Sequence, residues 1–150
     1  MATLKQKVHT HCLELCNERI TLAEGEMEAL SLALREETKS SAGDKYETSR
    51  SMINLEKEKI EENLLELIRK KQAINQIDPK NITQKVKVGS LVTTAAGTFL
   101  ISTSLGKVTI EGKDVFAISP ISPIAQVMLD LTSGDGFEFN GKKDSILSLS

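Results

Sequence analysis

Apolar residues recur at steps of three and four along the first half of the chain, which is the spacing of a helix that packs along a narrow stripe. One such series runs from Leu13 to Leu34 and a second from Ile53 to Ile74, with charged residues at most of the other positions. Gly43 is the strong helix breaker between them. We therefore predict two long helices that form an antiparallel coiled-coil hairpin over residues 4 to 76 and turn at Ser40–Asp44.

The members of the two series define the surface on which the helices are expected to meet. In the second helix two lysines take positions of the series and are expected to bury their stems. The first series is Leu13, Cys16, Ile20, Ala23, Met27, Leu30 and Leu34. The second series is Ile53, Lys57, Ile60, Leu64, Leu67, Lys71 and Ile74, widened by Leu65 and Ile68.

From Val86 onward the pattern changes to that of β-strands, after Asp78-Pro79 has ended the helical half. A short helix with Ser122 as N-cap and Pro123 in its first turn is predicted over residues 123 to 129. Strands with one helix predict a small α+β domain over residues 79–150, preceded by the hairpin over residues 1–78. The expected strand pairs are 88–95 with 98–102 around Ala96-Gly97, 108–111 with 114–118 around a type II′ turn at Gly112-Lys113, and 137–139 with 145–149 around Asn140-Gly141.

Composition narrows the function classes. The 150 residues carry a formal net charge of −2, so no bulk basic field points to nucleic acid. The N-terminus has no uninterrupted apolar region and the chain has no run of about 18 apolar residues, so we expect no signal peptide, no membrane span and a cytoplasmic protein. His9, Cys12 and Cys16 share a helical face, but structural zinc usually takes four ligands, so we interpret the cysteines as packing residues.

The predicted hairpin tip carries two carboxylates, Asp44 and Glu47, spaced three residues apart. This spacing fits a capping box, in which Asp44 accepts a hydrogen bond from a first-turn amide and Glu47 reaches back to the cap amide. It also fits a pair of ligands for a hard cation, although the spacing alone favours the cap. The cations nearby either attract an RNA phosphate or are solvated helix charges. They are Arg35, Lys39, Lys45 and Arg50.

Two motifs resemble those of the bacterial transcript cleavage factors of the GreA/GreB family, and the likeness covers roughly residues 5 to 150. Gly43-Asp44-x-x-Glu47 is similar to the family's Gly-Asp-x-x-Glu at the hairpin tip. Ser122-Pro123-Ile124-Ala125-Gln126-Val127-Met128-Leu129, followed by Gly134-Asp135, is similar to its Ser-Pro-Leu-Gly-x-Ala-Leu-Leu and following Gly-Asp. Ile77-Asp78-Pro79 falls where that family joins its coiled coil to its globular domain. Gly134-Asp135 is by itself most simply a turn.

The resemblance implies an FKBP-like domain that docks on RNA polymerase at the rim of the secondary channel. It also implies that the hairpin enters the channel, where Asp44 and Glu47 help to hold the second Mg²⁺ and position a water, so that the polymerase hydrolyses the 3′ end of a backtracked RNA. The chain would then be no enzyme itself, with no cofactor of its own beyond the Mg²⁺ it shares with the polymerase. We expect a monomer, because one hairpin closes its own seam. The docking residues implied are Ser122, Pro123, Ile124 and Gln126.

Three alternatives stay open from the sequence. The run Glu47-Thr48-Ser49-Arg50 differs from the family's pattern, and non-cleaving relatives with this build block or modulate the same channel. A prolyl isomerase, which an FKBP-like fold would allow, needs an aromatic-lined pocket, and the predicted domain has phenylalanines but no Trp or Tyr. The third alternative is a scaffold whose hairpin binds another coiled coil, a role for which a sharply acidic tip is not needed.

Overall fold

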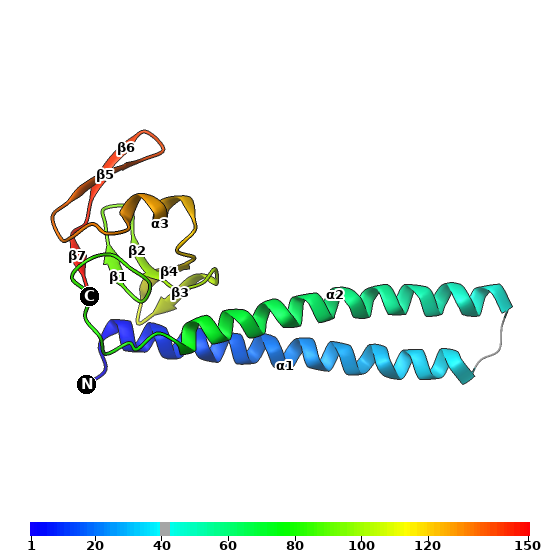
Figure 1. Ribbon diagram of the computed structural model, residues 1–150. Coiled ribbons are helices and arrows are strands. Elements are labelled where there is room, and N and C mark those ends of the chain that lie inside the picture. The colour runs from blue at the N-terminus through cyan, green and yellow to red at the C-terminus, as the bar shows by residue number, and fades with distance from the viewer. Residues whose placement is uncertain (40–42) are drawn as a thin grey trace. The chain divides into compact units, whose positions relative to one another are not determined.

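Two long helices form the first half of the structure. The computed structural model describes residues 1–39 and 43–150, and the side chains of residues 37–46 are outside that description. Helix α1 spans Leu4–Lys39 and helix α2 spans Gly43–Asn75, and the two run side by side in opposite directions (Figure 1). The predicted antiparallel hairpin is confirmed. Gly43 and Asp44 already belong to α2 rather than to the turn, and the rest of the predicted turn, residues 40–42, lies outside the described residues.

The predicted seam between the helices is also confirmed, because every member of the two series is buried or half-buried. Cys12 and Cys16 are fully buried, which confirms their interpretation as packing residues. The prediction that Leu65 and Ile68 widen the seam is wrong, since they are 54% and 37% exposed. Leu65 precedes the buried Leu67 by two residues, a rotation of about 200° around the helix, and this turns Leu65 away from α1.

A five-stranded sheet follows the helices, and the predicted small α+β domain is confirmed. The strand order is β3-β4-β2-β1-β7, and all neighbours are antiparallel except β2 and β4, which are parallel. Strands β5 and β6 form a separate hairpin. The elements are β1 (Leu91–Thr93), β2 (Thr98–Ile101), β3 (Gly106–Ile110), β4 (Lys113–Ile118), α3 (Pro123–Met128), β5 (Gly136–Phe139), β6 (Lys142–Ser145) and β7 (Ser148–Leu149).

The turn at Asn140-Gly141 is confirmed, but the strand predicted after it is divided in two. Asn140 and Gly141 have φ values of 52° and 77°, as a two-residue type I′ turn requires. The prediction of one strand over residues 145–149 is wrong, because β6 pairs with β5 whereas β7 pairs with β1. Ile146 lies between the two strands and is buried in the core of the domain. The chain therefore passes from one sheet to the other at a core residue.

The turn between β3 and β4 lies one residue earlier than predicted. Its central residues are Glu111 and Gly112, with φ values of 51° and 79°, so it is a type I′ turn and not a type II′ turn at Gly112-Lys113. The resulting register pairs Val108 with Val115, and both are buried. A shift of one residue would move one of these valines to the opposite face of the sheet, so the apolar pattern fixes the turn as much as the glycine does.

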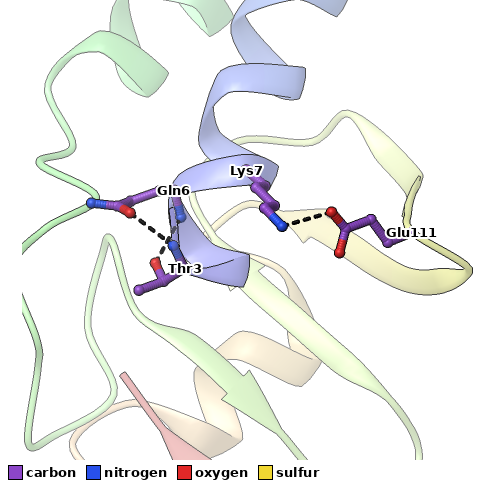
Figure 2. A network of polar contacts seen from close by, with 4 residues as sticks. All are labelled: Thr3, Gln6, Lys7 and Glu111. Carbon is purple, nitrogen blue, oxygen red and sulfur yellow. Dashed lines mark hydrogen bonds and ion pairs between the residues drawn. The ribbon is translucent and has the colours of Figure 1, made fainter. Parts of the chain in front are cut away.

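The sheet buries residues on both of its faces. One face packs against α3, and Phe99 and Ile101 of β2 share a core with Ala125 and Met128 of the helix. The first turns of α1 lie beside the other face (Figures 1 and 2). The buried strand residues on that second face are Leu91, Leu100, Val108, Val115 and Ala117. Removal of both faces from water supplies the main favourable free energy of this part of the fold.

Polar contacts hold the beginning of α1 in place (Figure 2). Thr3 and Gln6 cap the helix reciprocally, because Thr3 N donates to Gln6 Oε1 at 2.8 Å and Gln6 N donates to Thr3 Oγ1 at 3.2 Å. Lys7 Nζ donates to Glu111 Oε1 at 2.6 Å and thereby ties α1 to the β3–β4 turn. This hydrogen bond, together with the charge of Lys7, holds the pKa of Glu111 below its ordinary value.

Contacts divide the chain into two compact units. One is Leu15–Arg69, which contains the greater part of both long helices. The other contains both ends of the hairpin together with the strands and α3, as Met1–Glu14 and Lys70–Ser150. The first turns of α1 therefore belong with strands from the far half of the chain. The functional division predicted between residues 78 and 79 stays a prediction.

A single carboxylate joins the β1–β2 turn to β6. Asp144 Oδ1 accepts hydrogen bonds from Ser145 N at 2.7 Å and from Ala95 N at 3.0 Å, and Oδ2 accepts one from Ala96 N at 3.2 Å. Partial burial pushes the pKa of Asp144 upward, but the hydrogen bonds together outweigh it, so the pKa lies below its ordinary value. The charged form of Asp144 is thus the form that the folded chain favours.

Truncation of Leu67 should destabilise the hairpin, whereas truncation of Leu65 should not. Leu67 is 5% exposed, so Leu67→Ala removes buried contacts and leaves a cavity, at an expected cost of about 2–5 kcal/mol in the free energy of unfolding. Leu65→Ala is the matched control, with an expected change within about 0.5 kcal/mol. Urea unfolding followed by helical circular dichroism measures both. Equal losses in the two variants would contradict the position of the seam.

Acid should weaken the junction that Asp144 holds. Because its folded-state pKa lies below the ordinary value of 3.8, the carboxylate contributes stability above that pH, and the contribution is lost as the pH falls through the folded pKa. Asp144→Asn removes the charge, so the variant should be less stable at neutral pH and should lose less stability on acidification. Thermal melting from neutral pH down to about pH 3 measures the difference. Asp130→Asn, at an exposed position, is the control, and an Asp144→Asn profile parallel to wild type would rule out this role.

Candidate functional sites

The two carboxylates of the predicted tip lie in the first turns of α2. The helix begins at Gly43, so Asp44 and Glu47 occupy helical positions three apart, which lie on the same side of a helix. Glu47 is exposed and lines a shallow hollow of about 480 Å³. The side chain of Asp44 is outside the described part of the structure, so its capping role and its metal-binding role both stay predictions. The other residues of the hollow are Thr48, Ser51, Met52 and Leu55.

Two apolar side chains beside Glu47 are functional candidates that the sequence pattern did not single out. Met52 and Leu55 line the same hollow and are 63% and 58% exposed. Both fall off the seam, which passes through Ile53, and an apolar residue off the seam of a charged helix is the signal that identifies them. An exposed carboxylate edged by apolar surface offers a partner protein a ligand for a cation and an area to cover.

The residues before α3 form a closely bonded turn around Ser119. Ser122 occupies the N-cap position of α3 and Pro123 lies in the first turn, as predicted. The expected capping bond is not formed, because the Ser122 hydroxyl donates to Ser119 O at 2.6 Å instead. Ser122 N donates to the same oxygen at 3.0 Å, and Ile121 N donates to Ser119 Oγ at 3.2 Å. Ser119 therefore closes one side of the turn.

Gln126 holds the other side of the same turn. Its Nε2 donates to Pro120 O at 2.8 Å, and its backbone N donates to Ser122 O at 3.0 Å. Ile121 lies between these bonds and is 81% exposed. An apolar side chain on a fixed backbone loses little conformational freedom on binding, which is the property of an interface anchor. We call residues 119–122 the Ile121 turn.

The four predicted partner-binding residues have different surroundings. Pro123 and Gln126 are exposed and Ser122 is half-buried. Ile124 is half-buried and packs against the core of the domain, so most of its side chain is held inside. Ile121, which the sequence reasoning missed, takes the outward position next to them. Its signal in the sequence is an isoleucine between two prolines in a turn, where no strand or helix stripe requires an apolar residue.

Gly134-Asp135 is a turn, which confirms its simplest interpretation. Gly134 has a φ of 94°, a conformation that favours glycine. Asp135 Oδ2 accepts hydrogen bonds from Thr132 N at 2.8 Å and from Thr132 Oγ1 at 3.0 Å. These two bonds, the backbone one first, hold the pKa of Asp135 below its ordinary value. The pair therefore has a structural role in the loop that leads to β5.

The structure also bears on the other function classes. None of the helices among the described residues is long and apolar enough to cross a membrane. Within those residues no group of three or more His, Cys, Asp or Glu side chains is placed to hold a metal ion.

Two phenylalanine rings bear on the prolyl isomerase alternative. The rings of Phe99 and Phe116 pack against each other with centroids 5.9 Å apart, and Phe99 is 7% exposed. Phe99 is therefore part of the packing, whereas Phe116 is 37% exposed.

Comparison with known proteins finds distant structural similarity. No family model matches the chain, and no curated protein matches it. Two solved structures are similar to it, that of the transcription factor Gfh1 and that of GreA factor homolog 1 (Gfh1) protein of Thermus thermophilus. The first is 14% identical over 92% of both chains, with a TM-score of 0.35. The second is 13% identical over 92% of this chain and 94% of that one, with a TM-score of 0.36. Values this low carry no argument about function.

Proposed function

We propose that this chain is a transcription factor that binds RNA polymerase at its secondary channel and stimulates cleavage of backtracked RNA through Asp44 and Glu47. The observation that carries the proposal is a pair of carboxylate positions three apart at the start of α2, the second helix of a long hairpin. Helices of 36 and 33 residues extend about 50 Å at 1.5 Å per residue. A hairpin of that length suits the delivery of two acidic residues into a channel.

Carboxylates suit the chemistry of this role. Magnesium prefers hard oxygen ligands, and one or two carboxylates with phosphate oxygens and waters make up its usual shell. In two-metal sites the ions stabilise the attacking and leaving oxygens of phosphodiester cleavage. In the proposal the polymerase holds the first metal and performs the hydrolysis. This chain adds ligands for a shared Mg²⁺ and is not itself an enzyme, and the exposure of Glu47 supports such sharing.

The FKBP-like domain is proposed to dock on the polymerase through the Ile121 turn and the exposed side of α3. Ile121 and Val127 are 81% and 37% exposed and supply apolar contact area. Pro123 and Gln126 are exposed next to them. Interfaces gain most of their free energy from a few such anchors that become fully desolvated. The factor is expected to act as a monomer in the cytoplasm and to meet the RNA 3′ end only inside the polymerase.

A second candidate is a regulator that enters the same channel without promoting cleavage. It is favoured by Arg50, which follows Glu47 by three residues on α2 and so lies on the same side of the helix. A guanidinium at that spacing competes with a metal ion for the carboxylates. The two candidates share the docking surface and the hairpin, and they differ only in what the tip does to the polymerase.

Removal of the tip charges should abolish cleavage and leave binding intact. Asp44→Asn with Glu47→Gln keeps hydrogen-bond acceptors but removes the negative charge that Mg²⁺ requires. We expect RNA shortening in stalled, backtracked complexes to slow roughly a hundredfold, as for other lost electrostatic groups. Thermal stability should change little, since even outright loss of a helix cap costs about 0.5–2 kcal/mol.

The control for this variant is Glu56→Gln with Glu58→Gln, which removes two exposed carboxylates further along α2. It should cleave like wild type. If wild type cleaves and the tip variant cleaves equally well, the metal role is wrong. If wild type slows the polymerase without shortening RNA, the non-cleaving candidate takes its place.

Binding to the polymerase should depend on Ile121. Ile121→Ala removes the exposed anchor of the fixed turn, and we expect roughly tenfold or greater weakening of the affinity for purified RNA polymerase. Leu147→Ala is the matched control, because Leu147 is 57% exposed elsewhere on the domain. Surface plasmon resonance measures both. An Ile121→Ala variant that binds as tightly as wild type would show that the docking surface lies elsewhere.

A further inference from the structure

A cleft of about 520 Å³ lies in the unit that contains both chain ends, and the proposed function does not use it. Its lining comes from the start of α1, the end of α2, the linker that follows and the loop before β1, with single contributions from Ser102 and Pro120. Small-molecule sites occupy roughly 300–1,000 Å³, so this cleft has the size of a ligand site. Its walls combine polar and apolar side chains in similar shares, and three charged residues line it. These are Lys5, Asp78 and Lys87.

Lys5 is the unusual member of this group. The residue is 4% exposed, and its Nζ donates to Asn81 O at 2.6 Å. An ammonium has three donors, and a neutral backbone carbonyl is the partner of one of them. Burial lowers the pKa of Lys5, the charge of Asp78 raises it only in part, and the charge of Lys87 lowers it further. No ion pair joins Lys5 to Asp78 among the described residues, so the buried cation is left largely without a counter-charge.

The apolar wall of the cleft is exposed as well. Ile82 and Val88 line it and are 78% and 53% exposed. Exposed apolar residues that border a hollow with a buried charge are typical of a ligand site, where a few polar groups orient a ligand and apolar walls bind its body.

The charges in the cleft select the kind of ligand. Lys5 and Lys87 contribute two positive charges and Asp78 one negative charge, so the cleft has a net charge of about +1. A monoanion compensates this charge, whereas a dianion would leave the cleft with an excess negative charge. We propose that the cleft binds a small organic carboxylate, with its carboxylate on Lys5 and Lys87 and its apolar body against Ile82 and Val88. This proposal does not rest on the proposed function.

The test is a titration of the full-length, ¹⁵N-labelled protein with hexanoate, followed by NMR. Hexanoate has one carboxylate and an apolar chain, hexanamide has the same chain without the charge, and inorganic phosphate has the charge without the chain. We expect saturable shifts in the amides of residues 81–89 with hexanoate, and weaker binding of the other two probes. The absence of saturable shifts, or tighter binding of hexanamide or phosphate, would overturn the proposal.

Variants then assign the binding to the two lysines. Lys5→Met keeps a long stem and should weaken hexanoate binding roughly tenfold or more, as expected for loss of a charge-assisted hydrogen bond. Lys87→Met, at an exposed residue, should weaken it by a smaller factor in a chain that folds normally, so the test holds even where Lys5→Met unfolds. Lys107→Met removes an exposed lysine on β3, outside the cleft, and should bind like wild type. Unchanged affinity in Lys87→Met and in a folded Lys5→Met would refute the site.

Discussion

The pairing of two narrow apolar series is the constraint on which the rest of this chain depends. An isolated helix of this charged composition is marginal in water, and most helical stability in proteins comes from packing of an apolar face. Each helix here has one such stripe, and each buries it against the other. Lys57 and Lys71 occur within the stripe and are half-buried, as is expected of lysines whose stems pack and whose amines stay in solvent. A two-helix seam of this kind has no interior space for a ligand. Any binding or chemistry in this half of the chain is therefore expected on its surface, where Glu47 is exposed.

The sheet imposes a second constraint, because it has two apolar faces and only one short helix to cover them. Helix α3 covers one face, and the first turns of α1 lie beside the other (Figure 1). Val8 and Cys12 of α1 are fully buried, although both precede the predicted seam. The same helix therefore packs in two ways, on the domain through its first turns and on α2 through the rest. Lys5 is drawn into the interior by this arrangement, and the cleft around it follows from the close approach of the α1 start to the linker.

Local patterns predicted the elements well and their edges less well. The period of the apolar residues was enough to predict the hairpin, because the spacing of these residues directly identifies the seam between two helices. The preference of turn residues predicted the turn at Asn140-Gly141 correctly. It placed the turn at Gly112 one residue too late, because the pairing of Val108 with Val115 decides where that turn lies. Contacts between segments that are distant in the sequence could not be predicted from the local pattern. Nothing in the sequence near Lys5 indicates that Asn81 is its partner, and nothing near Ile124 shows that it faces inward while Ile121 faces outward.

The two candidate contact surfaces are built differently, and this difference bears on how function can vary. The Ile121 turn is held by hydrogen bonds that Ser119 accepts and that Ser122 and Gln126 donate, so its shape is part of the fold. Glu47 lies off the seam and is exposed, so a change at that position costs the hairpin little. In the proposed function, position 47 could therefore change from a metal ligand to a blocking group without loss of docking. In the proposed function, attachment and chemistry lie on separate surfaces, so the residues of the tip, rather than the architecture, would decide between a cleaving and a non-cleaving factor.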